Sequence, residues 1–239
     1  MSEYNYEGSA LLRLGEQLKN YNAAIADVIA KECPANARVL DFGAGFGTLT
    51  REVAKRITQP DCVEPDSRQR EALITEGFRC YETIIRVPDA SYDYVYSSNV
   101  LEHIQHDVAA LCELRRVLRP TGRLTLYLPA FQSLFTSMDT AIGHYRRYDA
   151  NMISARLREA GFVVQRVRYA DVLGFAVSLL FKYSFNKVDR INERTMMIYD
   201  SLVFPVSQAI ERFVTPPFGK NVIAVATCEA RSVDVRVAV

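Results

Sequence analysis

The chain has 239 residues, of which 49% are hydrophobic and 24% are charged, and its formal net charge at pH 7 is +1. These values are typical of a globular protein with ample core, and we expect a single domain over residues 1–239. So small a net charge gives no electrostatic footprint for nucleic acid, and we expect no nucleic-acid partner. The five cysteines include no C-x-x-C pair, which argues against zinc and disulfides and favours a reducing, cytoplasmic location.

The chain opens with a predicted helix, over residues 9–32, whose apolar side chains recur at steps of three and four. Strand and helix patterns then alternate. Strands are predicted at 38–41, 61–64, 78–81, 92–97 and 123–128, and helices at 49–57, 67–76 and 108–118. Repeated βα units predict parallel strands with helices on both faces, and a ligand site beyond the carboxyl ends of the strands.

A glycine-rich turn separates the first strand from the helix that follows it. Gly43, Gly45 and Gly47 stand at every second position, so the turn can direct backbone N–H groups and a helix N-terminus at a ligand. A dinucleotide-binding turn would place its third glycine at Thr48 and an apolar residue at Asp41. A nicotinamide-dependent oxidoreductase is therefore disfavoured.

The pattern D-x-G-x-G-x-G from Asp41 resembles the first motif of the class I S-adenosylmethionine-dependent methyltransferases. In that family the loop holds the methionine portion of the cofactor, and an acidic residue ending the next strand holds the ribose hydroxyls. Glu64, followed by Pro65, stands about twenty residues on, where a ribose carboxylate is expected. The resemblance implies S-adenosyl-L-methionine as the cofactor.

Two further stretches carry the same resemblance. Residues 93–104 resemble the family pattern D-x-V-x-S-x-x-V-L-E-H, and residues 114–122 are equally family-like. Many relatives have Asp-Ala after the third strand to hold the adenine amine, and Glu82 stands near that place here. In this motif we expect His103 to pack or cap near the sheet end. The cofactor-binding residues implied are Asp41, Gly43, Ala44, Gly45, Gly47, Glu64, Pro65, Glu82, Asn99 and Val100.

Some branches of the family are disfavoured. Residues 97–100 do not form the Asn/Asp-Pro-Pro-Tyr/Phe motif that holds a planar amide or exocyclic amine, which argues against methylation of DNA bases or glutamine. No three-carboxylate set can be picked out, so a magnesium-dependent catechol mechanism has no support and no metal is predicted.

Residues 143–149, after the fifth strand, are rich in hydrogen-bond donors. His144 is the predicted catalytic base, with Arg146 or Arg147 steering an anionic group of the acceptor. In an extended conformation His144, Arg146 and Tyr148 would share one face. The run resembles a bacterial branch of small-molecule methyltransferases, whereas Asp149 is expected to cap a helix over 152–159. The predicted substrate contacts are Tyr21, His144, Arg146, Arg147 and Tyr148.

The last two predicted strands, 163–169 and 221–228, form an antiparallel pair in this fold. About fifty residues intervene here, far more than a common connection, and they predict a helical insertion over 170–220 with helices at 172–185 and 192–213. Its apolar run is too short to span a bilayer. A lid over the acceptor pocket, formed by residues 172–192, or a homodimer contact is favoured over a membrane-surface face.

The predicted fold is therefore a doubly wound α/β sheet of seven mostly parallel strands, Rossmann-like, with the last strand antiparallel and a helical insertion before it. The predicted reaction is methyl transfer to the O or N of a small, anionic organic acceptor. Two alternatives stay open: a non-catalytic cofactor-binding module, and methylation of a lipid-linked or glycosylated acceptor at a membrane surface.

Overall fold

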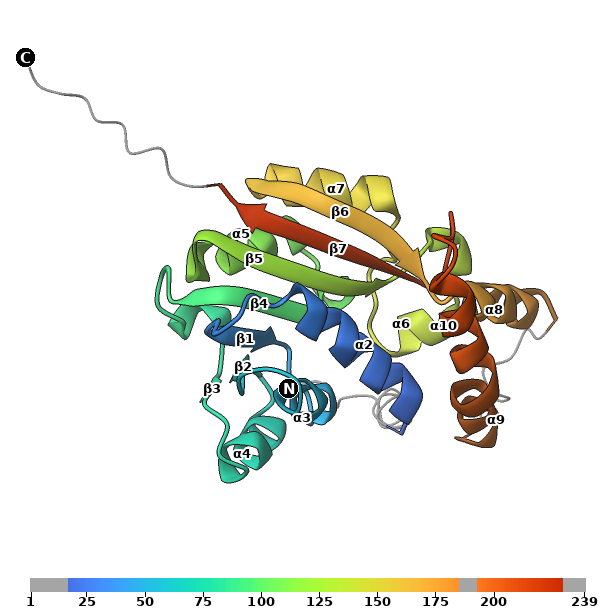
Figure 1. Ribbon diagram of the computed structural model, residues 1–239, viewed down its shortest axis with the longest axis horizontal. Helices are drawn as coiled ribbons and strands as arrows, with labels where there is room; N and C mark the ends of the chain where they lie inside the picture. Colours follow the sequence, from blue (N-terminus) through green and yellow to red (C-terminus); the bar gives the residue numbers. More distant parts are fainter. Residues whose placement is uncertain (1–16, 185–192, 230–239) are drawn as a thin grey trace, which may run out of the picture.

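One mixed sheet runs through the computed structural model, which describes residues 17–184 and 193–229. Within these ranges it has seven strands in the order β3-β2-β1-β4-β5-β7-β6, and only β7 is antiparallel to its neighbours (Figure 1). The predicted sheet is confirmed. The strands are β1 Val39–Phe42, β2 Asp61–Val63, β3 Cys80–Tyr81, β4 Tyr92–Ser98, β5 Leu118–Pro129, β6 Phe162–Ala170 and β7 Asn221–Cys228.

The order of the strands reverses beside β1. The chain moves outward from β1 to β2 and β3, and then returns to add β4 on the other side of β1. Strands that diverge in this way leave a crevice at their carboxyl ends, where ligands bind in open α/β sheets. The glycine turn begins directly after β1, at this switch point.

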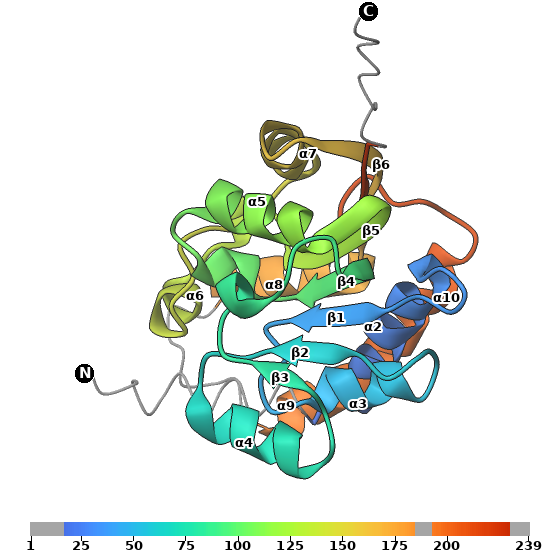
Figure 2. The same ribbon diagram turned by 90° about the vertical axis from the view of Figure 1, so that its left-hand side faces the viewer.

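Each face of the sheet has its own core, because side chains alternate along a strand. Tyr94 and Tyr96 of β4 pack with Ile25 of α2 (Lys19–Glu32), whereas Val95 packs on the opposite face with Leu111 of α5 (Asp107–Val117). Figure 2 shows α2, α3 (Thr48–Ala54) and α10 (Phe204–Glu211) on one side of the sheet and α5 and α7 (Ala150–Glu159) on the other. Helix α4 (Ser67–Thr75) packs against β2 through Leu73.

Several element boundaries differ from the sequence prediction. Helix α2 begins at Lys19, and the first part of the predicted helix lies outside the described residues. Strand β5 begins at Leu118 instead of residue 123, because Leu118 pairs with Tyr92 across a register shift in β4. A short helix, α6 (Ser137–Ala141), stands where no element was predicted.

The insertion between β6 and β7 is helical, as predicted. It contains α8 (Val172–Ser184), α9 (Glu193–Ile198), a π-helical turn over Tyr199–Val203, and α10, and it gathers at one end of the sheet (Figure 1). Among the described residues, no helix combines the length and apolar character that crossing a membrane requires.

Candidate functional site: a glycine turn and a cavity

The three glycines of the turn have different surroundings, although all have positive φ, at +86°, +56° and +79° for Gly43, Gly45 and Gly47. A Cβ built on Gly43 would lie 2.4 Å from Cγ2 of Val100, and one on Gly47 would lie 2.4 Å from Cδ2 of Leu73. A Cβ on Gly45 would meet nothing closer than Oε1 of Gln69 at 4.0 Å. Gly43 and Gly47 therefore allow close packing within the protein, whereas Gly45 leaves open space for a ligand.

Glu64 follows β2 and points back at this turn. Its Oε2 accepts a hydrogen bond from the Gly45 backbone N–H at 2.7 Å, and its Oε1 accepts one from the Asp66 N–H at 2.9 Å. Burial raises the pKa of Glu64, although these two backbone hydrogen bonds act to lower it. A carboxylate has about four lone-pair sites, so two remain to accept hydroxyl groups. The site fits a ligand that carries a vicinal diol.

Asp41 lies beneath the turn rather than at its surface. The hydroxyls of Thr50 and Tyr96 both donate to its Oδ2, at 2.7 and 2.8 Å. Burial raises the pKa of Asp41 to about 7, against the opposing effect of these two hydrogen bonds. The carboxyl group thus connects the end of β1 to α3 and to β4.

The other residues predicted to bind the cofactor lie at the carboxyl ends of neighbouring strands. Asn99, directly after β4, is exposed and has a positive φ of +53°, and Val100 packs under Gly43. Pro65 and Glu82 are exposed after β2 and β3, and the backbone N–H of Ala44 donates to Val63. The fold therefore brings these sequence positions to one edge of the sheet.

A cavity of about 470 Å³ lies beyond the carboxyl end of β5. Much of its wall is apolar, with Leu134 and Phe135 on one side and Val177 and Phe181 of α8 on another. Polar side chains reach it from four segments of the chain. They include Thr136 and Asp139 around α6, His144 and Arg147 after α6, Lys182 of α8, Tyr199 of the π-helical turn and Lys220 before β7.

Asp139 is the centre of the polar group in this cavity. Its Oδ1 lies 2.8 Å from Nδ1 of His144, and Nε and Nη2 of Arg147 reach its two oxygens at 2.8 and 3.0 Å. Burial alone would raise the pKa of Asp139, but the hydrogen bonds from His144 and Arg147 outweigh it and hold that pKa well below its usual range. Sequence reasoning missed Asp139, although Thr136-x-x-Asp139 has the spacing of a capping box, which the structure contains.

Arg146 and Tyr148 do not line the cavity. Arg146 donates to the carbonyls of Ile104 and Gln105 and pairs with Asp107 at 2.9 Å. The fully buried Tyr148 places its hydroxyl 3.1 Å from Oδ2 of Asp107.

The predicted face shared by His144, Arg146 and Tyr148 is therefore wrong, since His144 shares Asp139 with Arg147 instead. Residues 144–147 are not in a strand, and within this described stretch the only β-bridge is the one between Tyr148 and Ala130. Without the hydrogen-bond ladder of a β-sheet, successive side chains need not alternate between two faces.

Lys220 is a cavity residue that no sequence pattern indicated. Its Nζ lies 4.9 Å from the ring centre of Tyr199 and 5.7 Å from that of Tyr21. Burial lowers the pKa of Lys220, and the charge of Asp171 acts in the opposite direction. Tyr21 itself is buried against Tyr127 and does not line the cavity.

Glu102 and His103 connect the turn after β4 to this cavity. Oε1 of Glu102 lies 3.8 Å from Nε2 of His144, and the rings of His103 and His144 meet edge to face with centres 4.5 Å apart. Burial raises the pKa of Glu102 to about 8. Burial, followed by the charge of His144, lowers the pKa of His103 to about 4. His103 thus packs at the sheet end, as expected, but beside ionisable neighbours.

Known proteins resemble this chain in sequence and in fold. A family described as "Methyltransferase domain" matches residues 14–167. An uncharacterized methyltransferase of Mycobacterium sp. (strain KMS) is 30% identical over 154 residues, which are 61% of each chain. The match therefore spans about three fifths of that relative's length.

Solved structures agree in fold at low identity. A SAM-dependent methyltransferase from Archaeoglobus fulgidus has a TM-score of 0.58 at 15% identity, covering 89% of this chain and 94% of its own. Phosphoethanolamine N-methyltransferase 2 from Haemonchus contortus, in complex with S-adenosyl-L-methionine, has a TM-score of 0.58 at 18% identity, covering 88% of this chain and 52% of its own. From the family match, the shared fold and the glycine turn together, we conclude that the chain belongs to the class I S-adenosylmethionine-dependent methyltransferases.

Proposed function

We propose that this protein is a cytoplasmic enzyme that transfers a methyl group from S-adenosylmethionine to the O or N of a small organic acceptor. One observation carries the proposal: a glycine turn with open space at Gly45, after β1, and a cavity lined by ionisable groups, beyond β5, both lie at the carboxyl ends of the parallel strands. Asn99 and Glu102 belong to the same turn after β4, and Glu102 lies 3.8 Å from His144 of the cavity. The short segment from Asn99 to Glu102 thus connects the proposed cofactor site to the proposed acceptor cavity.

The residues around the turn suit the cofactor of the family. When bound, S-adenosylmethionine supplies an electrophilic methyl group on a sulfonium. Glu64 has lone pairs left for the ribose hydroxyls after accepting two backbone hydrogen bonds. Gly45 leaves room for close approach of a ligand to the backbone. We assign Pro65, Glu82, Asn99 and Val100 to the same site because they follow β2, β3 and β4 at the same edge of the sheet.

The cavity suits an acceptor with an apolar body and a polar, anionic end. Its apolar wall includes Val177 and Phe181 of α8, so we propose that the insertion covers the acceptor. Arg147 is already engaged with Asp139, and Arg146 with Asp107. Lys182, the other lysine of the cavity, donates to the backbone carbonyls of Ser133 and Phe135. Lys220 is therefore the cation that we assign to an anionic group of the acceptor, in place of Arg146.

We propose His144 as the base for an acceptor that must lose a proton. If Nδ1–H of His144 donates to Asp139, its Nε2 carries a lone pair and can accept that proton. Asp139 then acts as a positioning residue that fixes the tautomer and the ring.

The test is to incubate the full chain with S-adenosylmethionine labelled in its methyl group and a cell extract. Transfer of label to an extract component is expected from the wild type and is expected to be lost in Gly45→Val. Cofactor binding by the wild type without transfer to any component would favour the non-catalytic module. Absence of both binding and transfer would contradict the proposal.

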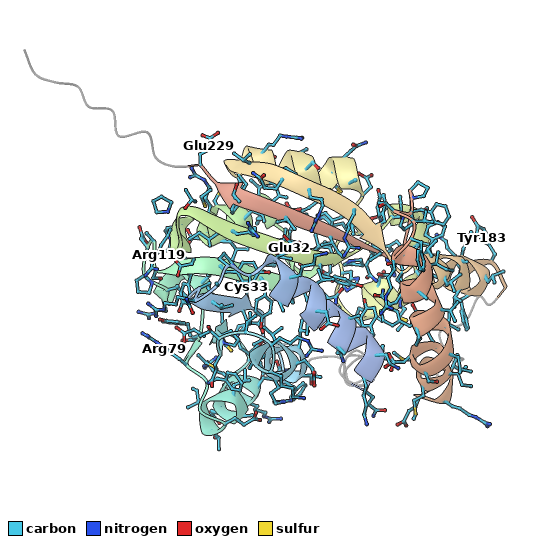
Figure 3. The ribbon with its side chains drawn as sticks, viewed as in Figure 1. Glu32, Cys33, Arg79, Arg119, Tyr183 and Glu229 are labelled. Atoms are coloured by element: carbon cyan, nitrogen blue, oxygen red, sulfur yellow. The ribbon has the colours of Figure 1, made fainter. Side chains whose placement is uncertain are left out.

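A second candidate is an acceptor with a lipid-like portion, methylated at a membrane surface. An apolar stripe at steps of three and four is exposed along the insertion, and Tyr183 points outward from the end of α8 (Figure 3). The stripe consists of Ile198, Leu202, Val206, Ile210 and Phe213, which are 48%, 65%, 53%, 40% and 88% exposed.

Sedimentation with phospholipid vesicles tests this candidate. The wild type is expected to bind them, and Leu202→Asp is expected to abolish the binding. A protein that stays in the supernatant but elutes as a dimer, dissociated by Leu202→Asp, would instead assign the stripe to a homodimer.

A further inference from the structure

Three side chains with metal-ligating atoms meet between the turn after β4 and the loop after α6. Glu102, His103 and His144 each offer one ligand atom, and these atoms all lie within 4.8 Å of one another. Nε2 of His144 and Oε1 of Glu102 lie 3.8 Å apart. Two imidazoles and one carboxylate form a ligand set that suits divalent transition metals.

Glu102 lacks the partners that a buried carboxyl group requires. It is 0% exposed, and neither Oε1 nor Oε2 has a hydrogen-bond partner among the described residues. A buried polar group without a partner is costly, so such a group calls for an ion, a water or a ligand. Arg147 does not fill this role, because its guanidinium bonds Asp139.

His144 is already oriented as a metal-binding imidazole would be. Its Nδ1 lies 2.8 Å from Oδ1 of Asp139, and its Nε2 faces Glu102. A carboxylate behind an imidazole fixes the tautomer that leaves the other nitrogen free for an ion. Asp139 is in turn held by Arg147 and by the backbone N–H of Thr136.

We propose that Glu102, His103 and His144 bind a divalent first-row transition metal ion, with Zn²⁺ as the probe. An ion about 2.1 Å from each ligand atom holds tetrahedral ligands roughly 3.4 Å apart, so only small side-chain movements are needed. Three protein ligands leave an open position, as in catalytic metal sites. Of the three ligands, His144 is the one that lines the cavity, so it connects the proposed metal site to the acceptor cavity.

The catalytic role of the ion, but not its binding, rests on the proposed methyl transfer. An ion at this place would polarise an acceptor oxygen and assist loss of its proton. His144 would then be a ligand instead of the base. The sequence did not indicate this set of metal ligands, because His144 stands some forty residues from Glu102. A search for three carboxylates also does not find a set that contains two histidines.

Calorimetric titration of the full chain with Zn²⁺, without cofactor, tests the site. One equivalent is expected to bind to the wild type. Glu102→Gln, which keeps the side-chain shape, and His144→Ala are each expected to weaken binding at least tenfold. The matched control is His106→Ala, since His106 is exposed and is the third histidine of the chain. It is expected to bind like the wild type.

Two results would overturn the site: a wild type that binds no stoichiometric Zn²⁺, or a Glu102→Gln variant with unchanged affinity. Should His144→Ala fail to fold, Glu102→Gln decides alone. Because the titration contains no S-adenosylmethionine, a failure to bind Zn²⁺ can be distinguished from a failure of the methyl-transfer assay. In that assay a chelator is expected to abolish turnover if the ion is catalytic, and unchanged turnover would overturn the catalytic role.

Discussion

The three glycines of the turn form one sequence pattern, but each position requires glycine for its own physical reason. Gly43 and Gly47 accommodate side chains of the protein itself, whereas Gly45 faces open space. A substitution at Gly43 should therefore act on stability, and a substitution at Gly45 should act on ligand binding. Gly77 provides a comparison, because it also has positive φ, at +91°, and no atom would lie within 4 Å of its Cβ.

The first prediction compares Gly45→Ala with Gly77→Ala. Both variants should lose about 1–2 kcal/mol of stability, because an L-residue in a left-handed conformation is strained. Only Gly45→Ala should also weaken binding of S-adenosylmethionine, measured by calorimetry on folded protein. Equal affinities in the two variants would show that the ligand does not approach Gly45.

The second prediction concerns the pH dependence of stability through Asp41. Its pKa in the folded protein is about 7, well above the value of about 3.9 in an unfolded chain. The folded state therefore holds the proton more tightly, and its stabilising contribution is full below pH 3.9 and is lost as pH rises to 7. The loss is at most about 4 kcal/mol, from a difference of about three pKa units.

Asp41→Asn should remove this dependence. The free energy of unfolding, measured by urea titration between pH 4 and pH 8, should fall less steeply with pH in the variant than in the wild type. Parallel curves for the two proteins would mean that Asp41 is ionised beneath the turn at neutral pH.

At the scale of elements, the insertion is held to the sheet through Asp171, which lies between β6 and α8. This buried carboxylate accepts hydrogen bonds from the Gly174 backbone N–H, at 2.9 Å, and from the hydroxyl of Tyr199. A Cβ on Gly174 would clash with both Asp171 and Tyr199. These contacts fix α8 against the π-helical turn, and both elements line the cavity.

The third prediction follows from that contact. Tyr199→Phe should cost about 1–3 kcal/mol of stability, because it leaves one buried acceptor of Asp171 without its donor. Tyr183→Phe is the matched control, since Tyr183 is 78% exposed, and it should change stability by less than about 0.5 kcal/mol. Equal effects in urea unfolding would contradict a structural role for the Tyr199 hydroxyl.

The elements themselves could be predicted from the sequence, because strand and helix periods are local. The Val39–Phe42 strand, its glycine turn and the helix after it are all encoded within sixteen residues. The cavity could not be predicted in the same way. Lys220 meets Asp139 and Arg147 there only because the antiparallel β7 returns beside β5, with Asn221 opposite Pro129. The pairing of β7 with β5 is not encoded in the periodicity of side chains along either strand.

The arginines after α6 illustrate the same limit. An alternating pattern assigns side chains to faces only where a ladder holds the backbone extended. Here Gly143 turns the chain with φ of +85°, and pairing begins at Tyr148. Arg147 therefore reaches Asp139 while Arg146 is held by Asp107. Which arginine lines the cavity depends on a turn that composition does not reveal.

At the scale of the whole molecule, ligand binding should stabilise the entire fold. The proposed cofactor site spans the ends of four strands, β1 to β4, so its occupation should oppose global unfolding. The fourth prediction is that S-adenosylmethionine at a hundred times its Kd raises stability by about 2.7 kcal/mol. A nicotinamide dinucleotide at equal concentration should leave Tm unchanged, and a larger shift with the dinucleotide would contradict the assignment.

The most direct test of the central claim is a calorimetric titration of S-adenosylmethionine into the full chain and into Glu64→Ala and Gly45→Val. One equivalent should bind to the wild type. Glu64→Ala should bind more weakly by about 1–3 kcal/mol, because the hydroxyl hydrogen bonds are lost. Gly45→Val should not bind while remaining folded, because its side chain fills ligand space. A wild type without binding, or equal affinity in all three proteins, would contradict the account.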